Sequence, residues 1–222
     1  MKVVVAVLGV PRSGTSMTAA ILHHLGVSMG EDLAAADCWC PRGWYEDRQF
    51  LTMHRALAHP HKDLNRLIAG LPAERPDLNE RQKALYRRVV ASRCRAGDTW
   101  GVKDPRLCFL IDHLAEALHG LAELRIVATR RPAEDSMMSL MRMFGMMRGD
   151  ADRVVNDYRR RLNAVLKAAR YPTIEVDYDE AIENPTSLPP RLATFAGRPM
   201  TAAAMCVVDP SLRRVGRLAG YV

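Results

Sequence analysis

The 222-residue sequence contains no apolar stretch that approaches the roughly 20 residues of a membrane-spanning helix. Its first apolar run, residues 3–10, is short and ends in Pro11-Arg12 without a small-residue cleavage site, which indicates a buried strand rather than a signal peptide. The five cysteines are odd in number and scattered, so they do not suggest a disulfide framework. We therefore expect a cytoplasmic protein with reduced thiols and no membrane span.

Patterns typical of metal sites and nucleic-acid sites are also missing. Cys38 and Cys40 have no second cysteine or histidine pair at zinc-ligand spacing, and the seven histidines share no such spacing. The 32 Lys and Arg residues exceed the 25 Asp and Glu residues, giving a net charge of +7, but they form no basic run or stripe interleaved with aromatics. The sequence thus predicts no metal and no nucleic-acid partner, whereas the basic excess suits an anionic ligand such as a nucleotide.

What the sequence does contain is a regular alternation of strand and helix patterns. Apolar, β-branched segments predict strands at residues 3–8, 99–102, 124–129 and 173–176. Helices are expected at residues 15–25, 46–57, 79–95, 107–119, from about 132 onward, 151–169 and 185–196, with a loop-rich connection at 59–77. The alternation predicts a single domain over residues 1–222. Its class is α/β, a three-layer P-loop-like fold with a mainly parallel central sheet of four to five strands flanked by helices. The ligand should bind beyond the carboxyl ends of the strands.

The most informative segment is residues 9–16, Gly-Val-Pro-Arg-Ser-Gly-Thr-Ser, between the first strand and the first helix. Such a turn directs backbone N–H groups and the positive end of a helix at one point, which suits an anion. A plain glycine turn with Ser/Thr capping has the same pattern. The spacing is similar to that of the nucleoside-triphosphatase P-loop, but Thr15 replaces the lysine that contacts the β- and γ-phosphates. The positive charge lies inside the loop instead, at Arg12.

Arg12 followed by the Gly14-Thr15 pair resembles the 5′-phosphosulfate loop of sulfotransferases that use 3′-phosphoadenosine 5′-phosphosulfate (PAPS). The match is to the arginine-bearing loop of tyrosyl-protein sulfotransferases and bacterial relatives. The resemblance implies transfer of a sulfuryl group from PAPS to a hydroxyl or amine of a small-molecule, carbohydrate or peptide acceptor, without a metal. It also implies that Arg12 stabilises the leaving group. The implied donor-binding residues of the loop are Pro11, Arg12, Ser13, Gly14, Thr15 and Ser16.

The end of the third predicted strand resembles the family's 3′-phosphate element, an arginine followed by a serine on the next helix. An arginine fork and a hydroxyl suit a terminal phosphate. The family's usual spacing fits Arg131 and Ser139, whereas the strand-end arginine, Arg130, is one residue farther from Ser139. We favour Arg130 with Ser139, keep Arg131 as an alternative, and consider Ser136 a weaker candidate.

Residues 100–106, Trp-Gly-Val-Lys-Asp-Pro-Arg, resemble the Lys-Asp-Pro run at the end of the family's second strand. The resemblance implies that Lys103 bonds the oxygen that bridges sulfur and the leaving nucleotide. Pro105 stands where cytosolic small-molecule sulfotransferases carry a catalytic histidine, so that base is excluded at this position. Asp104 is expected either to cap the following helix or to contact the acceptor.

The base must then come from another segment. Residues 43–48, Gly-Trp-Tyr-Glu-Asp-Arg, resemble the glycine–aromatic–acid segment of sulfotransferases that lack the histidine. Glu46 is the expected base and Asp47 the alternative, since a general base needs hydrogen-bond reach of the acceptor and some desolvation. Either acid would also be favourable in the first turn of a helix, which is the competing structural role.

Three further interpretations concern the rest of the chain. Arg213 and Arg214 resemble an arginine-rich element that contacts PAPS, and Arg214 is expected among the donor ligands. Six of the twelve methionines fall in residues 137–147, where they fill the core or line an adaptable acceptor pocket. Two other functions stay open. A nucleoside or small-molecule kinase needs the P-loop lysine and Mg²⁺ ligands, and a noncatalytic nucleotide-binding module needs no base.

Overall fold

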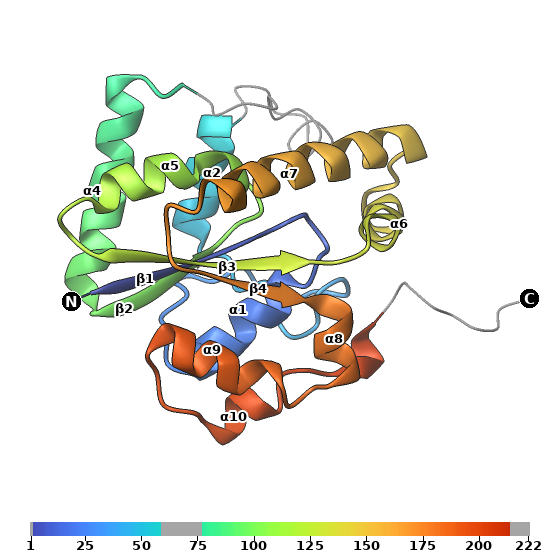
Figure 1. The fold of residues 1–222 in the computed structure, drawn as a ribbon. Coiled ribbons are helices and arrows are strands. Elements are labelled where there is room, and N and C mark those ends of the chain that lie inside the picture. The colour runs from blue at the N-terminus through green and yellow to red at the C-terminus, as the bar shows by residue number, and fades with distance from the viewer. Residues whose placement is uncertain (1, 59–76, 214–222) are drawn as a thin grey trace, which may run out of the picture.

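The computed structural model of the protein describes residues 2–58 and 77–213. Within these ranges the centre of the fold is a sheet of four strands, all parallel, in the order β2-β1-β3-β4 (Figure 1). The strands are β1 (Val3–Gly9), β2 (Thr99–Lys103), β3 (Glu123–Arg130) and β4 (Thr173–Asp177). The α/β class and the mainly parallel sheet predicted from the sequence are confirmed.

Strand β1 lies in the interior of the sheet, and both of its faces are covered. Val4, Ala6 and Leu8 pack into one hydrophobic cluster. Val5 and Val7 pack into the cluster on the opposite face. A continuous run of apolar, mostly β-branched residues is the sequence pattern of such a strand.

Helices form a layer on each face of the sheet (Figure 1). One layer consists of α1 (Thr15–His24), α8 (Tyr178–Glu183), α9 (Leu188–Ala196) and α10 (Ala202–Met205). The other consists of α2 (Arg48–Ala58), α4 (Glu80–Ala96), α5 (Leu107–Leu118), α6 (Ala133–Phe144) and α7 (Arg148–Ala168). A short 3₁₀ turn at Pro210–Leu212 follows α10.

Capping side chains fix several helix starts. Asn79 accepts a hydrogen bond from the N–H of Gln82, whose side chain accepts from the N–H of Asn79, a reciprocal cap that begins α4 as predicted. Asp177 accepts from two N–H groups of the next turn and so begins α8, a helix that the sequence analysis did not predict. The helix predicted at residues 185–196 is shorter, as α9, and α10 was also missed.

The strand order creates a crevice at the carboxyl edge of the sheet. β2 lies on one side of β1, whereas β3 and β4 lie on the other, so the order of the strands reverses between β1 and β3. Ligands of open α/β sheets bind at such a switch point. The loop after β1 and the residues after β3 meet there. No helix in the described ranges is both long and apolar enough to cross a membrane, and all five cysteines are free thiols.

Candidate active site

The loop between β1 and α1 has the backbone shape of an anion cradle. Arg12 (φ 72°) and Gly14 (φ 96°) adopt left-handed conformations, and the N–H of Ser13 donates to the carbonyl of Val10 at 3.1 Å. A Cβ at Gly14 would lie 2.5 Å from the ring of Tyr178, so only glycine fits. Unpaired N–H groups of the first turn of α1 add the positive end of the helix to this concavity. The glycine turn therefore forms a site suited to a phosphate or sulfate group.

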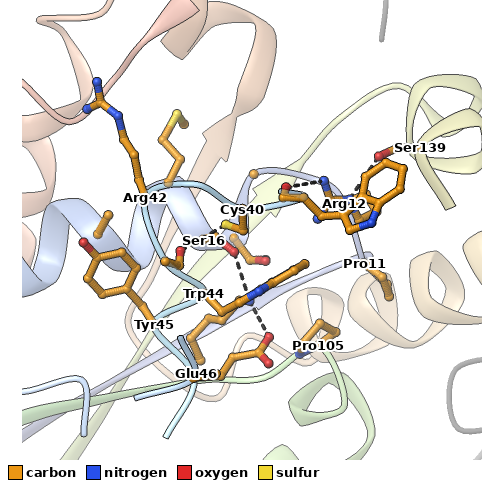
Figure 2. Close-up of a pocket in the computed structure, with 18 of the residues that line it drawn as sticks. Pro11, Arg12, Ser16, Cys40, Arg42, Trp44, Tyr45, Glu46, Pro105 and Ser139 are labelled. Atoms are coloured by element: carbon orange, nitrogen blue, oxygen red, sulfur yellow. Dashed lines mark hydrogen bonds and ion pairs between the residues drawn. The ribbon is translucent and has the colours of Figure 1, made fainter. Parts of the chain in front are cut away.

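A cavity of about 430 Å³ opens beside this loop, in the size range of small-molecule sites (Figure 2). It lies between the loop, the segment of residues 34–46, the end of β2, the middle and end of α6, and α8. The predicted site residues that line it are Pro11, Arg12, Gly14, Thr15, Ser16, Glu46, Lys103, Arg131 and Ser139. Ser13 instead turns away, and its buried hydroxyl lies 2.7 Å from that of Thr129. Arg214 lies outside the described residues.

The two consecutive arginines at the end of β3, Arg130 and Arg131, have different surroundings. Arg130, which the sequence analysis favoured, points to the exposed edge of the sheet, where it pairs with Glu175 and donates to Asn163 at 3.1 Å. Arg131 lines the cavity. Its guanidinium lies 4.4 Å from the ring centroid of Tyr178 and donates to the backbone carbonyl of Arg12 at 3.2 Å. The structure thus brings Arg131, rather than Arg130, to the phosphate loop.

Arg12 connects the loop to the middle of α6. Its Nε donates to the hydroxyl of Ser139 at 3.0 Å, and its terminal nitrogen donates to the carbonyl of Trp39 at 3.3 Å. Ser136 is buried on the same helix and does not line the cavity. The serine chosen from the sequence is therefore the one beside the loop arginine.

Lys103 and Glu46, which both line the cavity, form an ion pair. Lys103 also donates to the hydroxyl of Ser16 at 3.1 Å, so the lysine connects the acid with the phosphate loop. The side chain of Lys103 is 2% exposed and that of Glu46 is 14% exposed, which leaves the pair largely out of water. The ring of Trp44 lies 5.4 Å from the guanidinium of Arg12 and 5.6 Å from the ammonium of Lys103.

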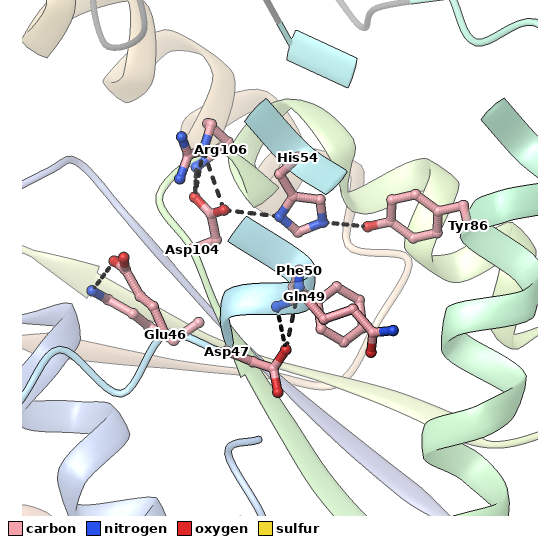
Figure 3. Close-up of polar contacts among 9 residues, drawn as sticks. Glu46, Asp47, Gln49, Phe50, His54, Tyr86, Asp104 and Arg106 are labelled. Carbon is pink, nitrogen blue, oxygen red and sulfur yellow. Dashed lines mark hydrogen bonds and ion pairs between the residues drawn. The ribbon is translucent and has the colours of Figure 1, made fainter. Parts of the chain in front are cut away.

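Asp47, the alternative base, has a structural environment instead. It is buried, pairs with Arg93, and accepts hydrogen bonds from the N–H groups of Gln49 and Phe50. It therefore caps α2, which begins at Arg48 rather than at the predicted residue 46. Glu46 and Asp47 point in different directions (Figure 3), and Glu46 is the one that faces the cavity.

A buried polar chain lies behind the cavity, and the sequence analysis did not find it (Figure 3). The Nδ1 of His54 lies 2.9 Å from Asp104, and its Nε2 lies 2.9 Å from the hydroxyl of Tyr86. Asp104 also accepts from the N–H and the Nε of Arg106, both at 2.9 Å. Asp104 thus orders the turn before α5 but does not cap that helix, whose N-cap position is Arg106 without a side-chain cap; the capping role expected from the sequence is wrong.

The charge states of Asp104 and Tyr86 follow from burial and from the groups around them. Burial alone would raise the pKa of Asp104, but Arg106 and His54 outweigh it and hold the pKa well below its usual range. Burial, together with the charge of Asp104, raises the pKa of Tyr86, so its hydroxyl stays protonated. Asp104 is therefore an ionised carboxylate enclosed by its two partners.

The segment of residues 37–44 covers the cavity and is held at two points. The carboxylate of Asp37 accepts from the N–H groups of Trp39 and Cys40 and from the indole N–H of Trp44. Arg42 donates to the carbonyls of residues 206 and 207 and pairs with Asp209 at 2.8 Å. The contacts of Asp37 are local, whereas those of Arg42 join segments far apart in the chain, so no spacing in the sequence points to the latter.

Sequence comparison identifies the class of protein. A model of the sulfotransferase family matches residues 5–202, so the chain belongs to the sulfotransferase family. It is therefore a transferase of sulfuryl groups, as the motifs after β1, β2 and β3 predicted. No curated protein sequence matches the chain.

Solved sulfotransferase structures share the fold. The sulfotransferase domain of the Synechococcus PCC 7002 olefin synthase superposes with a TM-score of 0.60 at 16% identity, covering 95% of this chain and 86% of that one. Sulfotransferase STF9 from Mycobacterium avium gives a TM-score of 0.56 at 16% identity, over 92% and 66% of the two chains. Sulfotransferase STF1 from Mycobacterium tuberculosis H37Rv gives 0.50 at 17% identity, over 94% and 71%. At these identities the likeness concerns the fold alone.

Proposed function

We propose that the protein transfers a sulfuryl group from PAPS to a hydroxyl or amine of an acceptor, with Glu46 as the base. One observation carries this proposal. A single cavity brings together a phosphate loop that carries Arg12 within it and Thr15 at the position of the usual lysine, a second arginine, Arg131, and the Glu46–Lys103 pair. Membership of the family indicates the type of donor, and the cavity contains groups suited to binding each anionic end of that donor.

The residues present fit the charge distribution of PAPS. The donor carries two separate anionic ends, a 5′-phosphosulfate and a 3′-phosphate. The loop offers N–H groups and the hydroxyls of Thr15 and Ser16 to the first of these. Arg131 and Ser139 offer a guanidinium and a hydroxyl to the second, and both line the same cavity. We assign the 3′-phosphate to Arg131 because Arg130 is paired with Glu175 outside the cavity.

The chemistry asked of the chain is positioning, proton removal and charge stabilisation. PAPS supplies the activated sulfuryl group. Glu46 takes the proton of the acceptor's hydroxyl or amine as the new bond to sulfur forms. Lys103 and Arg12 stabilise the negative charge that collects on the departing 3′,5′-bisphosphate as its bond to sulfur breaks. Lys103 contacts both Glu46 and Ser16, which holds the base and the loop in one geometry.

Nucleotide selectivity tests the assignment of the 3′-phosphate. Wild-type protein should bind 3′,5′-ADP about tenfold or more tightly than 5′-AMP, because a charge-assisted hydrogen bond contributes about 1.5–3 kcal/mol. Arg131→Ala should remove most of that difference in calorimetric titrations. Arg130→Ala is the matched control and should preserve it. Equal affinity for the two nucleotides in the wild type would eliminate the 3′-phosphate site, and a loss in Arg130→Ala alone would move the phosphate to Arg130.

Chelation separates the proposal from kinase chemistry. The groups assigned to the donor are cations, hydroxyls and backbone N–H groups, none of which needs a metal bridge. Binding of 3′,5′-ADP should therefore be unchanged in EDTA, measured by the same titration. If EDTA abolished binding and Mg²⁺ restored it, and if ATP bound better than 3′,5′-ADP, the kinase interpretation would replace this one.

A further inference from the structure

Arg106 closes the Lys103–Arg106 run, and the proposed chemistry gives it no role. It is 8% exposed, and its Nε donates to both oxygens of Asp104 at 2.9 and 3.2 Å. Asp104 is held from the other side by His54, which Tyr86 holds in turn (Figure 3). A guanidinium fixed through its Nε has a defined orientation, and little conformational entropy remains for it to lose on binding a ligand.

The other edge of this guanidinium faces the cavity. Arg106 lines it, and the two terminal nitrogens make no hydrogen bond with any residue in the described ranges. Burial lowers the pKa of Arg106, but Asp104 more than compensates and raises the pKa above its ordinary value, so the group stays charged. Up to four N–H donors of a permanent cation are thus directed into a partly desolvated space.

Arg106 shares the cavity with Glu46, the proposed base, and with residues of α2, α6 and α7, namely Leu51, Arg55, Met143, Phe144 and Tyr158. Apart from Arg55 and the hydroxyl of Tyr158, the side chains from these three helices are apolar. Glu46 lies close enough to influence the pKa of Arg106, so the base and this arginine face the same space.

We propose that Arg106 is a specificity-determining residue that binds an anionic group, such as a carboxylate, on the acceptor. The acceptor class is then a hydroxy acid or an amino compound with a carboxylate, whose apolar part contacts Leu51, Met143 and Phe144. A fixed guanidinium fork matches a carboxylate with two parallel hydrogen bonds. An uncharged acceptor leaves the terminal nitrogens of Arg106 unpaired in a site with little water, which disfavours it. This inference rests on the proposed function and names the substrate class of the same site.

Acids and their amides provide the test, because the primary amide keeps the size of the carboxylate and removes its charge. The panel pairs para-hydroxyphenylacetate with para-hydroxyphenylacetamide, lactate with lactamide, and tyrosine with tyrosinamide. Each compound is titrated into protein saturated with 3′,5′-ADP, and each is assayed for sulfuryl transfer from PAPS. At least one acid should bind about tenfold or more tightly than its amide and show a kcat/KM higher by the same factor. Arg106→Gln should reduce that ratio to near one.

Matched variants keep the outcome interpretable. Arg161→Gln is the control, since Arg161 pairs with Asp112 at 2.9 Å and lies outside the cavity; it should keep the wild-type ratio. If Arg106→Gln folds poorly, the double variant Asp104→Asn/Arg106→Gln, which removes both charges, takes the place of the single variant in the assays. Arg106→Lys should retain part of the preference for the acid but not all, because lysine lacks the fork.

Three outcomes would overturn the inference. The first is that no acid in the panel has a higher affinity and kcat/KM than its amide in the wild type. The second is that Arg106→Gln keeps the wild-type ratio of acid to amide. The third is that Arg106→Gln lowers turnover on acids and amides equally. The last result would assign Arg106 to the transferring sulfuryl group instead of the acceptor. Failure of the proposed function has a different signature, which is that 3′,5′-ADP does not bind. The acid and amide titrations on the nucleotide-free protein then still decide whether Arg106 binds a carboxylate.

Discussion

Glu46→Gln is expected to lower the turnover of sulfuryl transfer by about 10²–10⁴, which is the contribution of a positioned general base. Glutamine keeps the size of the side chain and can still accept a hydrogen bond from Lys103, so the cavity should keep its shape. Binding of 3′,5′-ADP should therefore stay close to that of the wild type. Steady-state assays with PAPS and any accepted substrate measure the first effect, and calorimetric titration measures the second.

Asp47→Asn is the matched control, because it removes a carboxylate from the next residue in the chain. Asp47 caps α2 and pairs with Arg93, so its loss should lower the free energy of unfolding and leave turnover of the folded protein nearly unchanged. Lys103→Ala should reduce both turnover and nucleotide affinity, which distinguishes it from Glu46→Gln. Transfer by Glu46→Gln at the wild-type rate would show that Glu46 is not the base.

The phosphate loop could be predicted from sequence because its chemistry is local. A buried apolar strand, a glycine turn and a helix start occupy one short segment. Arg12 and Thr15 distinguish this loop from a P-loop within a few positions. Lys103 was found for the same reason, since it ends a strand that lies beside β1. Carboxyl ends of parallel strands meet at one edge, so motifs at strand ends converge without further information.

The choice between Arg130 and Arg131 could not be made in this way. Arg130 ends β3 and Arg131 follows it, and the two differ in partners that include residues far along the chain, although Arg131 also pairs with Asp135 at 3.5 Å. Glu175 on β4 and Asn163 on α7 hold Arg130 at the exposed edge, whereas the ring of Tyr178 holds Arg131 over the loop. The family's usual spacing to Ser139 fits Arg131, the arginine that lines the cavity.

Glu46 and Asp47 illustrate the effect of a helix boundary. The acids are adjacent, and the sequence pattern continued the helix back to residue 46. Asp47 is the cap, so Glu46 precedes the helix and its side chain is free to face the cavity. Boundaries are set by such individual hydrogen bonds, which periodicity does not report. The buried chain through His54 was missed because its members, from α2, α4 and the end of β2, meet only in the folded protein.

The second large expected effect is a loss of stability when the buried hydrogen bonds of Asp104 are removed. Asp104→Asn should lower the free energy of unfolding at pH 7 by about 3–5 kcal/mol, since it leaves the charge of Arg106 buried without its partner. Asp157→Asn is the control. Asp157 pairs with Arg160 on the exposed side of α7, and the loss of such a surface pair changes stability by about 0–1 kcal/mol.

The pH dependence of this effect identifies its electrostatic origin. The pKa of Asp104 is depressed in the folded state, so the stability it contributes is present above its unfolded pKa of about 3.9 and is lost as the pH falls toward the folded value. Urea unfolding should therefore show the largest difference between wild type and Asp104→Asn near neutrality, and this difference should shrink once the pH drops below about 4. The double variant Asp104→Asn/Arg106→Gln should recover part of the loss, because neither charge is then left alone. A constant difference across this pH range, or a single variant as stable as the wild type, would show that the carboxylate is not the ionised partner of Arg106.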